Sequence, residues 1–287
     1  MIAKFNFYDV YGYFLPGLLL LTLLWLPFGM AYGRWPSGEL VTALLAIPLA
    51  YVAGHILQIF AIRVFPSTTK LKRFPSDVIL DKTNPIFSSE FKTRLAVKIK
   101  DTYGLDVYGD PATASRQRND ALFLCRSALI KAKAASYGEQ FEGMYSLMRG
   151  LTLAFLLGAS HIAGWCSVFI TRVRPWVLPS LLGALCIAIA IEFWQSPPPA
   201  KPARGKAIAS LVAVVLALLC GGYGLAEGQV ISVKLRYLLV GVVLIAGLLS
   251  RKCYHAYRSF TWEFAKAVYR DFATYEKPRG DEKSKAE

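Results

Sequence analysis

The sequence predicts an all-α integral membrane protein with about six transmembrane helices, a mainly helical cytoplasmic insert and a C-terminal amphipathic helix. Three observations predict this class. Hydrophobic residues make up 55% of the 287-residue chain and charged residues only 18%, with a mean hydropathy of +0.40, which is too apolar for a water-soluble domain of this size. Apolar stretches long enough to cross a bilayer core, about 20 residues each, recur along the chain. The positive charges are distributed very unequally among the segments that join those stretches.

The apolar stretches define the expected spans, with four or five spans as alternatives to six. The six are Tyr13 to Tyr32, Leu40 to Ile62, Leu151 to Ile170, Trp176 to Trp194, Ala207 to Ala226 and Tyr237 to Leu249. The last stretch is short, so we expect it to extend into Ser250 or to tilt little. The N-terminus lacks the layout of a cleavable signal peptide, so the first span is expected to stay in the mature protein.

The charges predict the topology. If both termini are cytoplasmic, 28 of the 33 lysines and arginines lie on that side of the membrane. The opposite side keeps only Arg34, Arg172, Arg174, Lys234 and Arg236. Most of the net charge of +14 then faces the cytoplasm, beside anionic headgroups or any anionic ligand there.

The spans divide the chain into five expected segments. These are an N-terminal segment with the first transmembrane hairpin (1–62), a cytoplasmic insert and stalk (63–149), four further transmembrane helices (150–249), a cytoplasmic amphipathic helix (250–276) and a disordered tail (277–287). The amphipathic helix is predicted by apolar and aromatic residues spaced three or four apart. The tail has no large apolar residue that could offset the entropy of ordering.

The insert is expected to begin with irregular structure or a short strand, because three prolines there disfavour a long helix. Ser88 or Ser89 then caps a helix that Gly104 ends. A second helical stretch from about Arg116 meets no strong break before the third span. Aromatic residues at helical spacing along this stalk, such as Tyr137 and Phe141, predict a seam that packs on a neighbour.

The second span carries the polar residues Tyr51, His55 and Gln58 at positions i, i+4 and i+7, so they share one stripe of the helix. His161 lies in the middle of the third span. Polar residues at membrane depth either line a functional path or form interhelical hydrogen bonds, which are worth about 0.6 to 2 kcal/mol. Both interpretations stay open for these four residues.

The same span holds a proline and two small residues. Pro48 removes the amide that would bond the carbonyl of Leu44, which predicts a kink. Ala50 and Gly54 form a small-xxx-small pair, which lets another helix approach closely. The sequence therefore predicts a kinked helix packed tightly against a neighbour.

Charged residues outside the spans form two candidate sites. Glu139, Glu142 and Arg149 lie on the stalk and are either ordinary surface charges or, in an oligomer, the lining of a cytoplasmic mouth. The second site is a set of cations that either anchor the helices at the membrane or bind an anionic ligand, such as a nucleotide or single-stranded nucleic acid. Its members are Arg116, Arg118, Arg126, Lys131, Lys133, Arg251, Lys252, Arg258, Lys266 and Arg270.

Signatures of catalysis are absent from the sequence. There is no HExxH, GxSxG or GxxxxGK[ST] motif, and no aspartate cluster that could hold Mg²⁺. Histidines and cysteines lack the spacing of a zinc site, and the cysteines suggest no disulfide framework. We therefore expect no enzyme, no metal and no cofactor.

The segments "YDVYGYFLPG", "YVAGHILQ" and "EQFEGMYSLMRGL" resemble those of small bacterial inner-membrane proteins that carry a cytoplasmic insert between spans. The layout is similar to that of membrane effectors of anti-phage defence, in particular the channel subunit of the Hailong system. This resemblance implies an oligomeric ion channel that an anionic nucleotide controls and that arrests or kills the infected cell by depolarisation.

Together these expectations describe a homo-oligomer in a bacterial inner membrane whose spans form an ion pathway, with a positive mouth that favours anions. The principal alternative is a non-conducting scaffold that recruits a cytoplasmic partner protein. An enzyme that acts on lipid is a third hypothesis.

Overall fold

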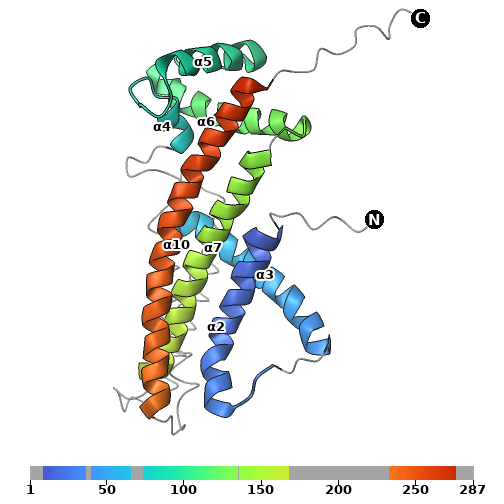
Figure 1. Cartoon of the computed structure of the whole chain (residues 1–287), viewed down its shortest axis with the longest axis vertical. Helices are drawn as coiled ribbons and strands as arrows, with labels where there is room; N and C mark the ends of the chain where they lie inside the picture. Colours follow the sequence, from blue (N-terminus) through green and yellow to red (C-terminus); the bar gives the residue numbers. More distant parts are fainter. Residues whose placement is uncertain (1–8, 37–39, 66–73, 135, 168–232, 276–287) are drawn as a thin grey trace, which may run out of the picture. The chain divides into compact units, whose positions relative to one another are not determined.

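The computed structural model describes residues 9–36, 40–65, 74–134, 136–167 and 233–275 (Figure 1). All secondary structure in these ranges is helical. In chain order the elements are a π-helix η1 (Val10–Phe14) and the α-helices α2 (Leu15–Tyr32), α3 (Leu40–Val64), α4 (Pro75–Ile79), α5 (Ser89–Tyr103), α6 (Pro111–Lys131), α7 (Ser136–Ser167) and α10 (Val233–Thr274).

Four segments of these helices are long and apolar enough to cross a membrane: Val10–Tyr32, Leu44–Val64, Tyr137–Trp165 and Tyr237–Thr274. They correspond to the first, second, third and sixth of the expected spans. The expected spans Trp176 to Trp194 and Ala207 to Ala226 lie outside the described residues.

The stalk residues from Ser136 run into the third span without a break, as expected, whereas α10 joins two elements that were expected to be separate. The stalk and the third span form one helix of 32 residues, and the sixth span continues through the expected amphipathic helix for 42 residues in all. No proline interrupts either helix, and no glycine follows Gly247 in α10, so nothing ends these helices early.

The chain divides into two compact units. Unit 1 comprises the described residues within Met1–Pro66 and Gly143–Ser259, and unit 2 those within Ser67–Glu142 and Phe260–Glu287. Each unit therefore contains a part of α7 and a part of α10, so these two helices pass from one unit into the other.

Unit 1 is a bundle of η1, α2, α3 and the adjoining parts of α7 and α10 (Figure 1). Helices α7 and α10 run antiparallel, since Ile162 packs beside Leu239 and the Ser250 hydroxyl donates to the carbonyl oxygen of Thr152 at 2.9 Å. Leu57 and Ala61 of α3 share a buried cluster with residues of α7, including Leu153.

Glycines set the closest approaches in unit 1. A Cβ on Gly17 would lie 2.6 Å from the Gly54 nitrogen, and one on Gly54 would lie 2.5 Å from the carbonyl carbon of Tyr13. A Cβ on Gly150 of α7 would lie 2.8 Å from Pro16 Cγ. The expected close approach at Gly54 is therefore confirmed, and the neighbour is η1 and the start of α2.

Unit 2 contains α4, α5, α6 and the adjoining parts of α7 and α10. Where irregular structure or a strand was expected, α4 begins at Pro75, a residue well suited to the first turn of a helix because its missing N–H needs no partner there. The expected α5 is confirmed: Ser88 caps it by accepting from the Phe91 amide at 3.2 Å, and Gly104 ends it with φ 70°.

Helix α6 starts before Arg116, at Pro111, and ends at Lys131, so the expected continuity with α7 is wrong. The helix closes in a Schellman motif, in which the Ala134 amide donates to the Leu129 carbonyl and the Lys133 amide to the Ile130 carbonyl. Lys133 occupies the left-handed position of this motif, with φ 54°, where glycine is usual.

We predict opposite effects for two glycine substitutions in helices. Gly54→Ala forces α3 away from η1 and should lower the free energy of unfolding by about 1 to 3 kcal/mol. Gly247→Ala meets nothing within 4 Å and should raise it by up to about 1 kcal/mol through helix propensity. Unfolding in mixed detergent micelles measures both, and equal effects would contradict the close approach.

A second prediction concerns the end of α6. Lys133→Gly should stabilise the protein by about 0.5 to 1 kcal/mol, because glycine adopts the left-handed conformation without the cost of a Cβ. Lys133→Ala removes the same charge but keeps the Cβ, so it is the matched control and should bring no gain. A similar stabilisation by both variants would show that charge, and not backbone conformation, governs this position.

Candidate functional site

Gln58 is the most connected polar residue of unit 1. It lies on α3, is 3% exposed, and its Nε2 donates to the carbonyl oxygens of Gly12 and Ser146, each at 2.7 Å. Both amide hydrogens are therefore used, and the one side chain joins three elements, η1, α3 and α7.

Arg149 completes this contact from α7. Its Nε and Nη2 donate to Oε1 of Gln58 at 3.2 and 3.1 Å, so the carboxamide oxygen accepts two bonds from one guanidinium. The guanidinium carbon lies 5.8 Å from the ring centroid of Tyr145 and 5.9 Å from that of Tyr257, within the range of cation–π attraction. Arg149 is 6% exposed, so we call Gln58, Arg149 and the carbonyls of Gly12 and Ser146 the Gln58–Arg149 node.

The other two residues of the predicted stripe lie in an aromatic stack. His55 stacks on Tyr13 with ring centroids 3.8 Å apart and an interplanar angle of 15°, and Tyr51 meets His55 edge to face at 4.6 Å. The predicted stripe thus faces η1, and in the single chain its residues make interhelical contacts.

His161 is buried on α7, and its Nε2 accepts from Trp165 Nε1 at 3.3 Å. This is a contact within one turn of the same helix. Among the described residues, no group of three or more histidines, cysteines, aspartates or glutamates could hold a metal ion.

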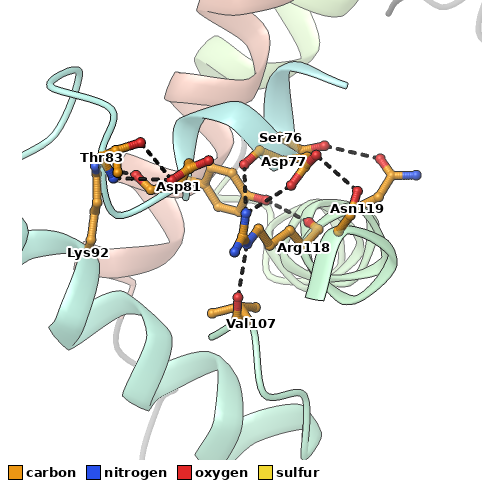
Figure 2. Close-up of polar contacts among 10 residues, drawn as sticks. Ser76, Asp77, Asp81, Thr83, Lys92, Val107, Arg118 and Asn119 are labelled. Carbon is orange, nitrogen blue, oxygen red and sulfur yellow. Dashed lines mark hydrogen bonds and ion pairs between the residues drawn. The ribbon is translucent and has the colours of Figure 1, made fainter. Parts of the chain in front are cut away.

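Unit 2 has a polar centre of its own, built on an ion pair between α4 and α6. Figure 2 shows Arg118 between two partners: its Nη1 contacts Asp77 Oδ1 at 3.0 Å, and its Nε donates to the Val107 carbonyl at 2.9 Å. Ser115 donates to the other carboxylate oxygen of Asp77 at 2.9 Å. The Asp77 side chain is 1% exposed and that of Arg118 is 14% exposed, so loss of either partner would leave a buried charge without its counter-charge.

A buried lysine organises the loop before α5. Lys92 is 2% exposed, and its ammonium donates to the carbonyl oxygen of Asp81 at 2.7 Å (Figure 2). It also donates to the carbonyl oxygen of Asn84. The Asp81 carboxylate in turn accepts from the Thr83 amide and hydroxyl. The sequence offered no signal for Lys92, because lysines are normally exposed.

Cys125 lies in the core of unit 2. Burial raises the pKa of its thiol to about 12, so the thiolate is scarce at neutral pH and the group is unreactive. Burial also raises the pKa of the Tyr108 hydroxyl. Neither group is prepared for acid–base chemistry near neutral pH.

Half of the predicted anion-binding cations have carboxylate partners. Arg116, Arg118, Arg126, Lys266 and Arg270 pair with Asp120, Asp77, Glu142, Glu263 and Asp271. The other five, Lys131, Lys133, Arg251, Lys252 and Arg258, form no ion pair within the described ranges. Lys131, Lys133, Arg251 and Lys252 are exposed as well, as is Arg116 beside Asp120, so these cations keep their charge available.

The structure separates the three stalk residues that were expected at a cytoplasmic mouth. Glu139 is exposed, Glu142 pairs with Arg126 of α6, and Arg149 is buried in the Gln58–Arg149 node. Sequence analysis identified Gln58 and Arg149 separately but did not pair them. Their common signal was a polar residue near the same end of two apolar helices.

We predict that the Gln58–Arg149 node stabilises unit 1. Gln58→Leu removes all four hydrogen bonds of the carboxamide, including the two that it accepts from the buried Arg149 guanidinium, and should lower the free energy of unfolding by about 3 kcal/mol. A double-mutant cycle with Arg149→Met should give a coupling energy of about 1 to 3 kcal/mol.

The control for this prediction is Thr22→Val. The Thr22 hydroxyl is exposed and bonds only the carbonyl of Leu18 in its own helix, so the change should stay within about 0.5 kcal/mol. Additive effects of the Gln58 and Arg149 substitutions would show that the two side chains do not interact.

No protein-family model, curated protein or solved structure matches this chain. Its function is therefore argued from the residues and their geometry.

Proposed function

We propose that the protein is a homo-oligomeric ion channel of a bacterial inner membrane, in which unit 1 conducts and unit 2 binds an anionic nucleotide or oligonucleotide that gates it. The four apolar helices support the membrane assignment. Both termini and unit 2 lie on the cytoplasmic side, as the positive-inside rule favours. An effector of anti-phage defence is the biological role that this activity suits.

The observation that carries the proposal is the continuity of α7. Within unit 2, Glu142 of this helix is bound by Arg126 of α6. Within unit 1, seven residues further along the same helix, Arg149 is bound by Gln58 of α3. Residues seven apart lie on the same side of an α-helix, so a movement at Glu142 is passed along two turns to Arg149.

The ligand acts by competing with Glu142. Arg126 is partly exposed, with a side-chain accessibility of 33%, and a phosphate offers the same bidentate oxygens as a carboxylate. Lys131 and Lys133, exposed at the end of the same helix, supply further positive charge. A ligand that takes Arg126 from Glu142 binds one state of α7 better than the other, which gating requires.

The conducting path is formed between subunits. The exposed faces of α3 and α10 are apolar, with Leu45 and Leu244 61% and 64% exposed, and these faces meet lipid or a neighbouring subunit. The polar groups of the Gln58–Arg149 node and the Tyr13–His55 stack satisfy one another in the described arrangement, which we assign to the closed state. Release of Arg149 would present its charge to the path and favour anions.

A scaffold that recruits a cytoplasmic partner protein is the second candidate. Unit 2 exposes large apolar side chains, with Phe123 and Tyr137 both 58% exposed and Val97 54% exposed. Exposed apolar residues of this size are typical of protein-binding surfaces. The two candidates differ in whether the purified oligomer conducts.

We predict that the purified oligomer in a planar bilayer shows conductance that a panel of cyclic dinucleotides, cyclic trinucleotides and short RNA oligonucleotides modulates. Lys131→Gln combined with Lys133→Gln should lower the apparent affinity for the active compound about tenfold or more, since two charged contacts are lost. The matched control removes two positive charges from α5, as Arg94→Gln with Lys100→Gln, and should leave that affinity unchanged.

A folded oligomer that shows no ligand-sensitive conductance with any compound of the panel would overturn the channel proposal. An equal loss of affinity in the α5 control would assign the effect to net charge alone and overturn the placement of the ligand site at the end of α6. A silent oligomer that binds one partner protein through Phe123 would establish the scaffold.

A further inference from the structure

Helix α10 carries a stripe of residues that is apolar in its first part and basic in its second. Leu244 and Leu248, both 64% exposed, lie on it, and Arg251, His255 and Arg258 continue it at steps of three or four residues. The apolar and the basic parts therefore face the same direction. All of these residues belong to unit 1.

The stripe changes from apolar to basic where both α3 and α10 pass from apolar to charged residues. In α3 the apolar residues end at Arg63, and Phe65, just after the helix, lies beside Tyr254 of α10, with ring centroids 5.5 Å apart. The Tyr257 hydroxyl donates to the Phe65 carbonyl at 2.9 Å. Aromatic side chains beside cations at the end of apolar helices are typical of the headgroup level of a membrane. From Arg251 to Arg258 the helix rises about 10 Å, which is close to the depth of one headgroup layer.

The basic part of the stripe lacks counter-charges among the described residues of its own unit. Among these residues, only Asp9 carries a carboxylate. Arg251, Lys252 and Arg258 form no ion pair in the part of the chain that the structure describes, and Arg251 and Lys252 are exposed. Within the described ranges these cations are therefore available to an external anion.

We propose that Arg251, Lys252, His255 and Arg258, here called the basic stripe, bind the headgroup of an anionic phospholipid. A single lipid can lay its acyl chains over Leu244 and Leu248 while its phosphate contacts Arg251 and Arg258, because the two parts of the stripe are continuous. A free nucleotide offers nothing to cover the apolar part, so the geometry favours a lipid. The proposal does not depend on conduction.

This assignment divides the cations of the chain between two ligands. The cations of α6 remain for a soluble anion, whereas those of α10 hold lipid. A basic residue near an anionic bilayer surface strengthens binding about fivefold, so the loss of three should weaken binding about a hundredfold. Lipid bound at this level fixes the depth of α10, a helix that also enters unit 2.

The test measures lipid bound to the full-length protein by native mass spectrometry, with dioleoylphosphatidylglycerol titrated against dioleoylphosphatidylcholine. Wild type should retain phosphatidylglycerol selectively, and the triple variant Arg251→Gln, Lys252→Gln, Arg258→Gln should lose this selectivity. The matched control removes three cations from α6 and the turn that follows it, as Arg116→Gln, Lys131→Gln, Lys133→Gln, and should keep the phosphatidylglycerol selectivity of wild type. Circular dichroism verifies that each variant is folded.

Three outcomes would overturn the proposal. Selectivity that survives in the folded triple variant would place the lipid elsewhere. Equal loss in the α6 control would reduce the effect to net charge. Equally tight binding of glycerophosphoglycerol, which has the same phosphate but no acyl chains, would identify a site for soluble anions. None of these measurements involves conductance, so failure here is distinct from failure of the channel proposal.

Discussion

The need to satisfy buried polar groups without water governs unit 1. Gln58 lies where three helical elements meet, and its carboxamide serves two backbone carbonyls and a buried guanidinium at once. An apolar residue of the same size could fill the space but would remove the hydrogen bonds to both carbonyls and the acceptor of the buried guanidinium. Gly150 serves the same hydrogen bonds, because it has no side chain where Gln58 Nε2 lies. A Cβ on Gly150 would be only 2.9 Å from that nitrogen. The polar node and the close glycine contacts are therefore two parts of one arrangement.

Charge has different uses in the two units. In unit 2 several charges are internal: Asp77 holds Arg118, Glu142 holds Arg126, and the Lys92 ammonium is bound by loop carbonyls. In the described part of unit 1 Asp9 carries the single carboxylate, the other acidic or basic side chains apart from tyrosine, histidine and cysteine are cations, and Arg251 and Lys252 are exposed where α10 leaves its apolar stretch. These ion pairs of unit 2 join its helices to one another, whereas the exposed cations of α10 are available to bind an anionic ligand.

The fold was predictable as far as local chemistry determines it. The caps of α5 followed from Ser88 and Gly104, and four of the apolar stretches were recognised as helices from their length alone. The end of α6 was missed because Lys133 adopts the left-handed backbone conformation, which a sequence normally indicates by a glycine. The pairing of Gln58 with Arg149 was also missed, since it joins positions 91 residues apart and depends on how α3 packs against α7. The burial of Arg118 and Lys92 could not be read from the sequence either, because both need partners that only tertiary structure brings together.

The π-helix at Val10–Phe14 has a consequence for the contacts of its own residues. The Leu15 amide bonds the Val10 carbonyl, one residue further back than in an α-helix, so this turn accommodates one residue more than regular geometry allows. Each residue of an α-helix accounts for a rotation of about 100°. Removing one residue between Gly12 and Leu15 would restore a regular helix and keep α2 in place, yet it would swing Gly12 about a quarter of the way around the axis. The carbonyl of Gly12 reaches Gln58 Nε2, so this hydrogen bond depends on the residue count of the turn.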